Sequence, residues 1–136
     1  MMHQLLKTIT VALLLNCVTL ANTQAQDNAP QIFTVVEQMP EYVGGEDAMH
    51  QFIVDNIKYP TVEKNKNISG TVYVTMVINT NGNLSNISVL RGVKNGAGLD
   101  EEALRVIKAM PKWNAGKQNG KPVAVQYNLP IRFSLK

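Results

Sequence analysis

Side chains that could support catalysis are sparse in this sequence. His50 is the only histidine after His3, and we expect it on the exposed side of a helix near Asp47. A general base needs a hydrogen-bonded partner and a pocket, and a lone surface histidine has neither. The only cysteine is Cys17, so the usual histidine and cysteine ligands of a zinc or other transition-metal site are missing. We therefore predict that the chain is not an enzyme and holds no metal and no cofactor.

A second group of residues is spaced like a phosphate-binding loop. Gly92, Gly96 and Gly98 lie close together, but no Lys-Ser or Lys-Thr pair follows them and no βαβ pattern surrounds them. We interpret this stretch as a flexible connection between a strand and a helix. Glu101 and Glu102 follow it, and because they are adjacent they point to different helix faces. We expect them to stabilise the helix N-terminus rather than to form an acid/base pair.

Four predicted elements precede the C-terminal strand. Apolar residues at helical spacing predict a helix over 46–57, which must end by Tyr59-Pro60 because a residue before proline is disfavoured in a helix. Alternating residues predict a strand over 71–78, a turn at 79–82 and a return strand over 83–91 with a bulge near Asn86. A second helix is predicted from an N-cap at Asp100 to Pro111.

The longest predicted strand is the last, over residues 123–135. Apolar residues occupy every odd position, so one face should be buried and the other wet. A helix separates this strand from the hairpin, so we place it beside the first hairpin strand, at the sheet edge. Pro130 fits an edge because proline has no N–H for a second neighbour. The order predicts an α+β fold with a three-stranded antiparallel sheet and two helices packed on one face.

The N-terminal residues form a separate segment. Residues 1–25 combine one lysine, an apolar run over 8–21 and a polar stretch that ends in Ala25. This order is typical of a secretory signal peptide, and the run is shorter than the roughly 20 residues of a spanning helix. An uncleaved helix, or lipidation at Cys17, would instead attach the protein to a membrane. Residues 26–45 are an extended lead-in that could form a short strand or dock on the core, and 46–136 are the folded domain.

The composition describes one globular domain of mild charge. The chain has 136 residues, of which 45% are hydrophobic and 17% charged, and its formal net charge is +3. The basic residues are scattered along the chain, so we expect no nucleic-acid surface.

Several short motifs follow one another in a fixed order from residue 46 onward. They are Tyr59-Pro60 after the first helix, Gly70-Thr71-Val72 at the first strand, Asn81-Gly82 in the hairpin, the segment 99–104, Trp113, and the segment 119–123. In this order and spacing the chain resembles the C-terminal domain of the TonB family, and the stretch 39–45 resembles the lead-in of Bacteroidetes-type members. We expect structural roles for Pro60, Gly70, Gly82, Trp113, Gly120 and Pro130.

The resemblance implies a periplasmic module of TonB-dependent transport across the outer membrane. Such a module binds a short extended peptide, the TonB box of an outer-membrane receptor, by strand addition to its last strand. The segment before the Tyr-Pro pair also touches the peptide in the family. We expect binding to be strongest before Pro130. The expected partner-binding residues are Val123, Ala124, Val125, Gln126, Tyr127 and Asn128 in the last strand, with Asn56, Lys58 and Tyr59 near the first helix.

Three other interpretations stay open. One is a full energy transducer, whose retained N-terminal anchor couples it to inner-membrane motor proteins. A transducer also has a long proline-rich linker, which is not evident here, so the sequence favours a stand-alone exported domain. A second is a structural homodimer that pairs two copies through the same edge strand. In the third, Pro130, Arg132 and Lys136 only protect the edge from aggregation.

Overall fold

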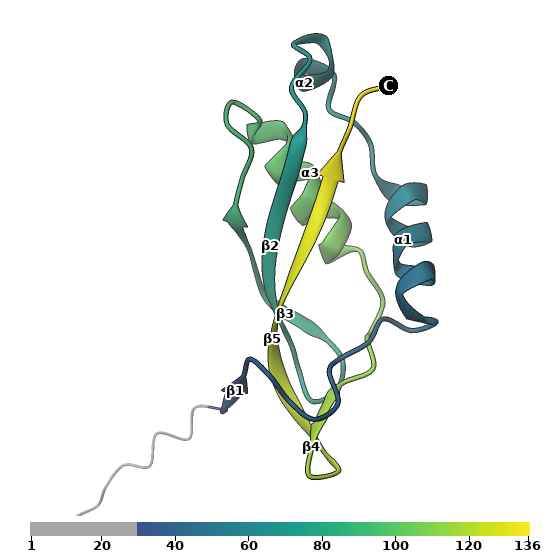
Figure 1. The fold of residues 1–136 in the computed structure, drawn as a ribbon, viewed down its shortest axis with the longest axis vertical. Coiled ribbons are helices and arrows are strands. Elements are labelled where there is room, and N and C mark those ends of the chain that lie inside the picture. Colours follow the sequence, from purple (N-terminus) through teal and green to yellow (C-terminus); the bar gives the residue numbers. More distant parts are fainter. Residues whose placement is uncertain (1–29) are drawn as a thin grey trace, which may run out of the picture.

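The computed structural model of this chain describes residues 30–136, which form a twisted sheet with helices on one face (Figure 1). The signal peptide expected over 1–25 lies outside the described residues. Within 30–136, no helix is both long and apolar enough to cross a membrane. The elements are, in chain order, β1 (Ile32–Phe33), α1 (Gly45–Asn56), α2 (Thr61–Asn65), β2 (Gly70–Ile78), β3 (Leu84–Arg91), α3 (Ala97–Lys108), β4 (Gly116–Gln118) and β5 (Lys121–Phe133).

The sheet is mixed and has the strand order β1-β5-β2-β3, with β4 paired to the start of β5. Strand β2 pairs antiparallel with both β3 and β5, as predicted. The predicted three-stranded antiparallel sheet is nevertheless wrong in extent, because β1 adds a parallel strand beside β5 and β4 adds a short antiparallel one. A short strand was one of the two possibilities expected for the lead-in and corresponds to β1, whereas β4 was not predicted because three residues are too few for an alternation signal.

The helices also differ in number from the two that the sequence predicts. Helices α1 and α3 correspond to the predicted pair, and α2 is an additional helix of five residues that follows Pro60. One and a half turns are too short for a helical period to be recognised. The predicted N-cap at Asp100 is wrong: α3 begins at Ala97, and Asp100 lies in its first turn. Its Oδ1 accepts a hydrogen bond from the Val93 N–H at 3.2 Å.

The hydrophobic core lies between the sheet and the helices. The odd positions of β5 from Val125 to Phe133 are buried or half-buried and the even positions are exposed, which confirms the predicted two faces. Strand β2 contributes its alternate apolar residues, and α3 covers them with one side of its surface. The principal core residues are Met49, Val72, Val74, Met76, Ile78, Leu99, Ala103, Ile107, Leu129, Ile131 and Phe133.

The hairpin between β2 and β3 contains the predicted bulge. The register changes from Thr75 opposite Ser88 to Val77 opposite Ser85, so β3 has an extra residue there. Asn86 has a φ of 49° within this stretch, a conformation that asparagine tolerates better than most residues. A tight turn closes the hairpin, where the Gly82 N–H donates to the Asn79 carbonyl at 2.9 Å.

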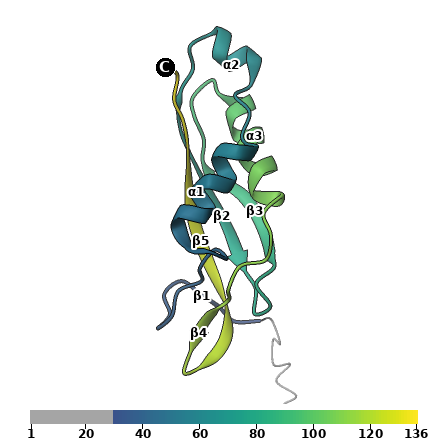
Figure 2. The same cartoon turned by 90° about the vertical axis from the view of Figure 1, so that its right-hand side faces the viewer.

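The lead-in forms the short strand β1 and also docks on the domain, so both possibilities that the sequence left open occur. After β1 it forms isolated antiparallel bridges from Gln38 to Lys117 and from Glu41 to Asn114. Tyr42 is buried in the core. The β4–β5 hairpin projects from the end of the molecule opposite α2, and the lead-in runs beside its base (Figures 1 and 2). The segment therefore ties the hairpin to α1.

The residues with expected structural roles lie at element boundaries and in the sheet. Pro60 is the N-cap of α2, Gly70 begins β2, and Gly120 lies in the turn between β4 and β5. Gly82 and Trp113 contact each other, because the Trp113 N–H donates to the Gly82 carbonyl at 2.9 Å. Pro130 lies in β5, and its partner across the ladder is Tyr73 of β2.

Candidate partner-binding site

The predicted partner-binding residues of β5 are neighbours of three different segments. Val123 pairs with Gly116 of β4. Ala124 and Val125 lie opposite Ile32 and Phe33 of β1, on the side of β5 away from β2. Part of the edge predicted for a partner is thus occupied by the chain itself.

The remainder of that edge has no strand beside it among residues 30–136. From Gln126 to Phe133, β5 pairs only with β2. Gln126 and Asn128 are exposed and Tyr127 is half-buried, so three of the six predicted strand residues belong to the open edge. A partner strand can pair directly with residues 126–133, where the edge is open. Pairing with 124–125 would require displacement of β1.

The position of Pro130 indicates which backbone groups point out of this edge. In an antiparallel pair, alternate residues direct both N–H and C=O toward the same neighbour. Pro130 has no N–H to donate to β2, yet it lies within the regular register of the β2–β5 ladder. The backbone groups of Pro130, and of every second residue from it, therefore point away from β2. Gln126, Asn128 and Arg132 are such alternate residues. Their amides and carbonyls are therefore the groups that an added strand could bind.

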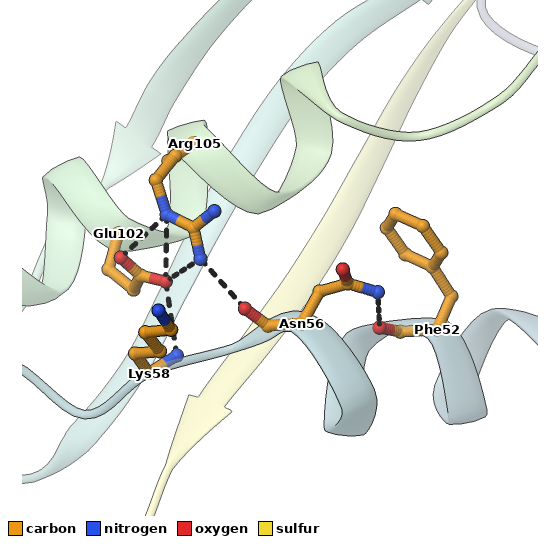
Figure 3. A network of polar contacts seen from close by, with 5 residues as sticks. All are labelled: Phe52, Asn56, Lys58, Glu102 and Arg105. Atoms are coloured by element: carbon orange, nitrogen blue, oxygen red, sulfur yellow. Dashed lines mark hydrogen bonds and ion pairs between the residues drawn. The ribbon is translucent and has the colours of Figure 1, made fainter.

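Asn56 ends α1, and Lys58 and Tyr59 lie in the connection to α2; a polar network joins Asn56 and Lys58 to α3 (Figure 3). Arg105 Nη2 donates to the Asn56 carbonyl at 2.7 Å, and the Lys58 N–H donates to Glu102 Oε1 at 3.1 Å. Glu102 and Arg105 also form an ion pair. The hydrogen bond from Arg105 lowers the pKa of the Glu102 carboxyl against the opposing effect of partial burial.

Tyr59 places this connection near the C-terminal end of β5. Its ring packs edge-on against Phe133, with a centroid distance of 5.7 Å and an interplanar angle of 89°. Its hydroxyl donates to the Ile68 carbonyl. The predicted residues of 56–59 and 123–128 therefore lie toward opposite ends of β5. The structure does not gather them into one compact site, but the open edge of β5 runs between them.

A cavity of about 330 Å³ lies between α1 and this open edge. Met49 and Ile53 of α1 form one wall, and residues 127–130 of β5 form another. Trp113 contributes to it and contacts Tyr42 and Tyr127 edge-on, at centroid distances of 5.7 and 5.3 Å. Tyr127 and Asn128 are the two predicted partner-binding residues that line this cavity, whereas no binding role was predicted for Met49, Ile53 or Glu46.

The glycine-rich loop before α3 is filled by carboxylates of the same chain. Glu63 of α2 is buried, and its Oε1 accepts the Gly98 N–H at 2.7 Å. A Cβ on Gly98 would lie 2.4 Å from that oxygen, so only glycine permits this approach. A carboxylate at this position also interacts favourably with the helix dipole. The loop connects a strand to a helix, as predicted, and its capping residue comes from α2.

Within residues 30–136, no three histidine, cysteine, aspartate or glutamate side chains cluster as a metal site would require. His50 is exposed on α1, and its Nε2 lies 3.5 Å from Glu46 Oε1.

Comparison with known proteins gives one family. The profile of the Gram-negative bacterial TonB protein C-terminal family matches residues 55–135. Proteins named Protein TonB from two strains of Xanthomonas campestris pv. campestris are each 31% identical over 78 residues, which cover 57% of this chain and 34% of theirs. This chain thus spans about a third of the length of these curated relatives.

Two solution structures of the Helicobacter pylori TonB C-terminal domain are similar to this structure. They have TM-scores of 0.48 and 0.49 and are 25% and 27% identical in sequence. The matches cover 65% and 68% of this chain, and 78% and 97% of the two compared chains. The family profile extends from the end of α1 through β5, which is more than half of the sequence. This chain belongs to the family of Gram-negative bacterial TonB protein C-terminal domains.

Proposed function

We propose that this protein is an exported periplasmic binding module of TonB-dependent transport, without enzymatic activity. Its ligand is an extended segment of the TonB-box type in an outer-membrane receptor, which adds a strand to β5. The observation that carries the proposal is the open edge of β5 over 126–133, where no strand of the described chain lies. An unpaired edge within a stable sheet is the feature that β-strand addition uses.

The parity of β5 supports this mode of binding. Gln126, Asn128 and Arg132 direct their backbone groups away from β2, and Pro130 contributes only a carbonyl there. A strand of four or five residues can therefore form its ladder before Pro130 with both donors and acceptors. Beyond Pro130 it loses one hydrogen bond, which agrees with the expectation that pairing is strongest before this residue.

Strand β1 provides an internal example of the same pairing. Ile32 and Phe33 add to β5 in parallel at Ala124 and Val125. Ile32 is 43% exposed, so this short strand is only partly covered. A receptor segment can lie beside β5 from Gln126 onward, next to β1. Alternatively, it can replace β1 and contact all the predicted partner-binding residues of β5, from Val123 to Asn128.

The segment 56–59 extends the proposed contact toward the other end of β5. Tyr59 packs on Phe133, seven positions from Gln126 along the strand. At about 3.3 Å per residue, a strand of roughly seven residues covers that length. We propose that a segment of this size contacts Gln126, Tyr127 and Asn128 first and reaches Asn56, Lys58 and Tyr59 at its far end.

A titration followed by nuclear magnetic resonance tests the proposal. An isotope-labelled chain is titrated with a synthetic TonB-box peptide of a receptor from the same cell envelope. We expect amide shifts over 126–133, with smaller shifts at 56–59. Shifts confined to other surfaces, or none, would contradict strand addition at this edge.

Two further measurements separate the alternatives. In sedimentation without peptide, a dimer would favour the structural homodimer and a strict monomer would exclude it. N-terminal sequencing of the exported protein addresses membrane attachment. A chain that begins at Gln26 excludes the retained anchor of a full transducer, and also lipidation at Cys17, whereas an intact N-terminus favours coupling to inner-membrane motor proteins.

A further inference from the structure

We infer that the cavity between α1 and β5 is a specificity pocket for a lysine or arginine side chain of the added peptide. This inference rests on the proposed function and deepens it, because it specifies one residue of the ligand. The cavity has a volume of about 330 Å³, and residues 127–130 of β5 form one of its walls. The pocket and the open edge are thus parts of one surface.

The geometry of an added strand directs side chains into this pocket. Residues opposite one another on adjacent strands point to the same face of a sheet. Tyr127 and Leu129 point to the face that the helices cover, since both are shielded from solvent while their neighbours Gln126 and Asn128 are exposed. A peptide residue opposite Tyr127 or Leu129 therefore directs its side chain toward α1. A residue one position away points to the exposed face.

The walls of the pocket suit a long side chain with an aliphatic stem. Met49 and Ile53 from α1 and Leu129 from β5 provide apolar surface. The rings of Tyr42 and Tyr127 also line the pocket, and aromatic rings attract cations through their faces. Methylene groups can pack on the apolar walls while the charged end stays near the opening, as lysine and arginine commonly do.

The charge of the pocket selects a cation. The chain has a formal net charge of +3, yet the carboxylates that line this cavity are those of Glu41 and Glu46, and no lysine or arginine lines it. Both glutamates are exposed, so they surround the opening rather than the interior. His50 also lines the cavity and lies 3.5 Å from Glu46, which leaves Glu41 as the carboxylate without a histidine beside it.

The main chain holds Glu41 in place. Its N–H donates to the Asn114 carbonyl at 3.1 Å, and its own carbonyl accepts the Asn114 N–H at 2.8 Å. Glu46 lies in the first turn of α1. Both residues precede the region 55–135 that the family profile matches, so the charge of this pocket comes from the part of the chain outside the matched domain.

Synthetic peptides with one variable position test the inference on the full chain. The host peptide is acetyl-Ser-Thr-Val-Thr-X-Thr-Val-Thr-Ser-amide, in which X is lysine, norleucine or glutamate. Norleucine keeps the aliphatic stem and removes the charge. We expect the lysine peptide to bind about fivefold more tightly than the norleucine peptide at low salt, as one or two exposed ion pairs provide, and the glutamate peptide to bind most weakly. High salt should reduce the difference.

A pair of matched protein variants locates the effect. The double variant Glu41→Gln with Glu46→Gln should bind the lysine and norleucine peptides equally. The control, Glu37→Gln with Glu101→Gln, changes the net charge by the same amount at two exposed positions that do not line the cavity. It should retain the preference for lysine.

The possible failures are distinguishable. Equal affinity of the lysine and norleucine peptides for the unmodified chain, with amide shifts over 126–129, would overturn the pocket and leave strand addition intact. A lysine preference that the control pair also removes would show a general charge effect and overturn the pocket as well. If no peptide of the series shifts the resonances of β5, strand addition itself fails and the pocket fails with it.

Discussion

Trp113 and Gly82 pack main chain against main chain. The Trp113 N–H donates to the Gly82 carbonyl at 2.9 Å, and a Cβ on Gly82 would lie 1.9 Å from the Trp113 carbonyl oxygen. This contact joins the turn of the β2–β3 hairpin to the segment after α3. The Trp113 ring in turn contacts Tyr42 of the lead-in and Tyr127 of β5. The middle of β5, and with it the candidate site, is therefore connected to Gly82 through Trp113.

We predict that Gly82→Ala strongly destabilises the domain. Gly82 has a φ of 83°, and an alanine there costs about 1–2 kcal/mol from the left-handed conformation alone. The overlap with the Trp113 carbonyl adds about 1–3 kcal/mol. Gly120→Ala is the matched control, because its φ is 75° but no atom lies within 4 Å of the added Cβ. Urea denaturation of both variants measures the difference, and equal destabilisation would contradict the packing argument.

A second prediction concerns the buried carboxylate of Glu63. We expect Glu63→Ala to reduce the free energy of unfolding by about 1–3 kcal/mol, because the Gly98 N–H loses its acceptor. Glu63→Gln keeps an acceptor oxygen and should cost less. The control is Glu101→Gln, an exposed position on α3. If Glu63→Ala behaves like Glu101→Gln in thermal and urea denaturation, Glu63 does not cap α3.

The Glu102–Arg105 pair predicts a pH dependence of stability. Because the folded-state pKa of Glu102 is lowered, its ionised form stabilises the fold above the unfolded pKa of about 4.3, and this stabilisation disappears as the pH falls through the folded pKa. Glu102→Gln should therefore be less stable than the unmodified chain at pH 7, and this difference should shrink as the pH falls below the unfolded pKa. Urea denaturation across this range measures the difference, which a constant gap would refute.

One substitution in β5 should weaken peptide binding without disturbing the fold, because alternate residues of this strand direct their N–H groups away from β2. Asn128→Pro removes an N–H that points away from β2, as Pro130 already does, so the fold should persist in circular dichroism. Peptide affinity should fall about tenfold, because the N–H donor of one ladder hydrogen bond is lost and a carbonyl of the peptide is left without its donor. Asn128→Ala keeps the N–H and should bind normally. Unchanged affinity of the proline variant would place the added strand elsewhere.

Much of the fold was predictable because long elements repeat their pattern many times. The two faces of β5, the hairpin at 79–82 and the bulge at Asn86 were predicted from alternation and turn residues and are confirmed. Helix α2 and β4 were missed because each is too short to show a period. The α3 N-cap was misplaced because Glu63, which binds the first turn, lies 35 positions away in the sequence.

The sequence was sufficient to predict the faces of the main elements and the family resemblance, and partner binding at the last strand stays a prediction. Those properties depend on residues close together in the chain, which share one local conformation. Only the tertiary structure decided that β1 covers Ala124 and Val125, that the open edge runs over 126–133, and that Glu41 and Glu46 surround a pocket beside it. These features join segments about 80 to 90 positions apart, and a one-dimensional pattern contains no information about which distant backbone groups meet.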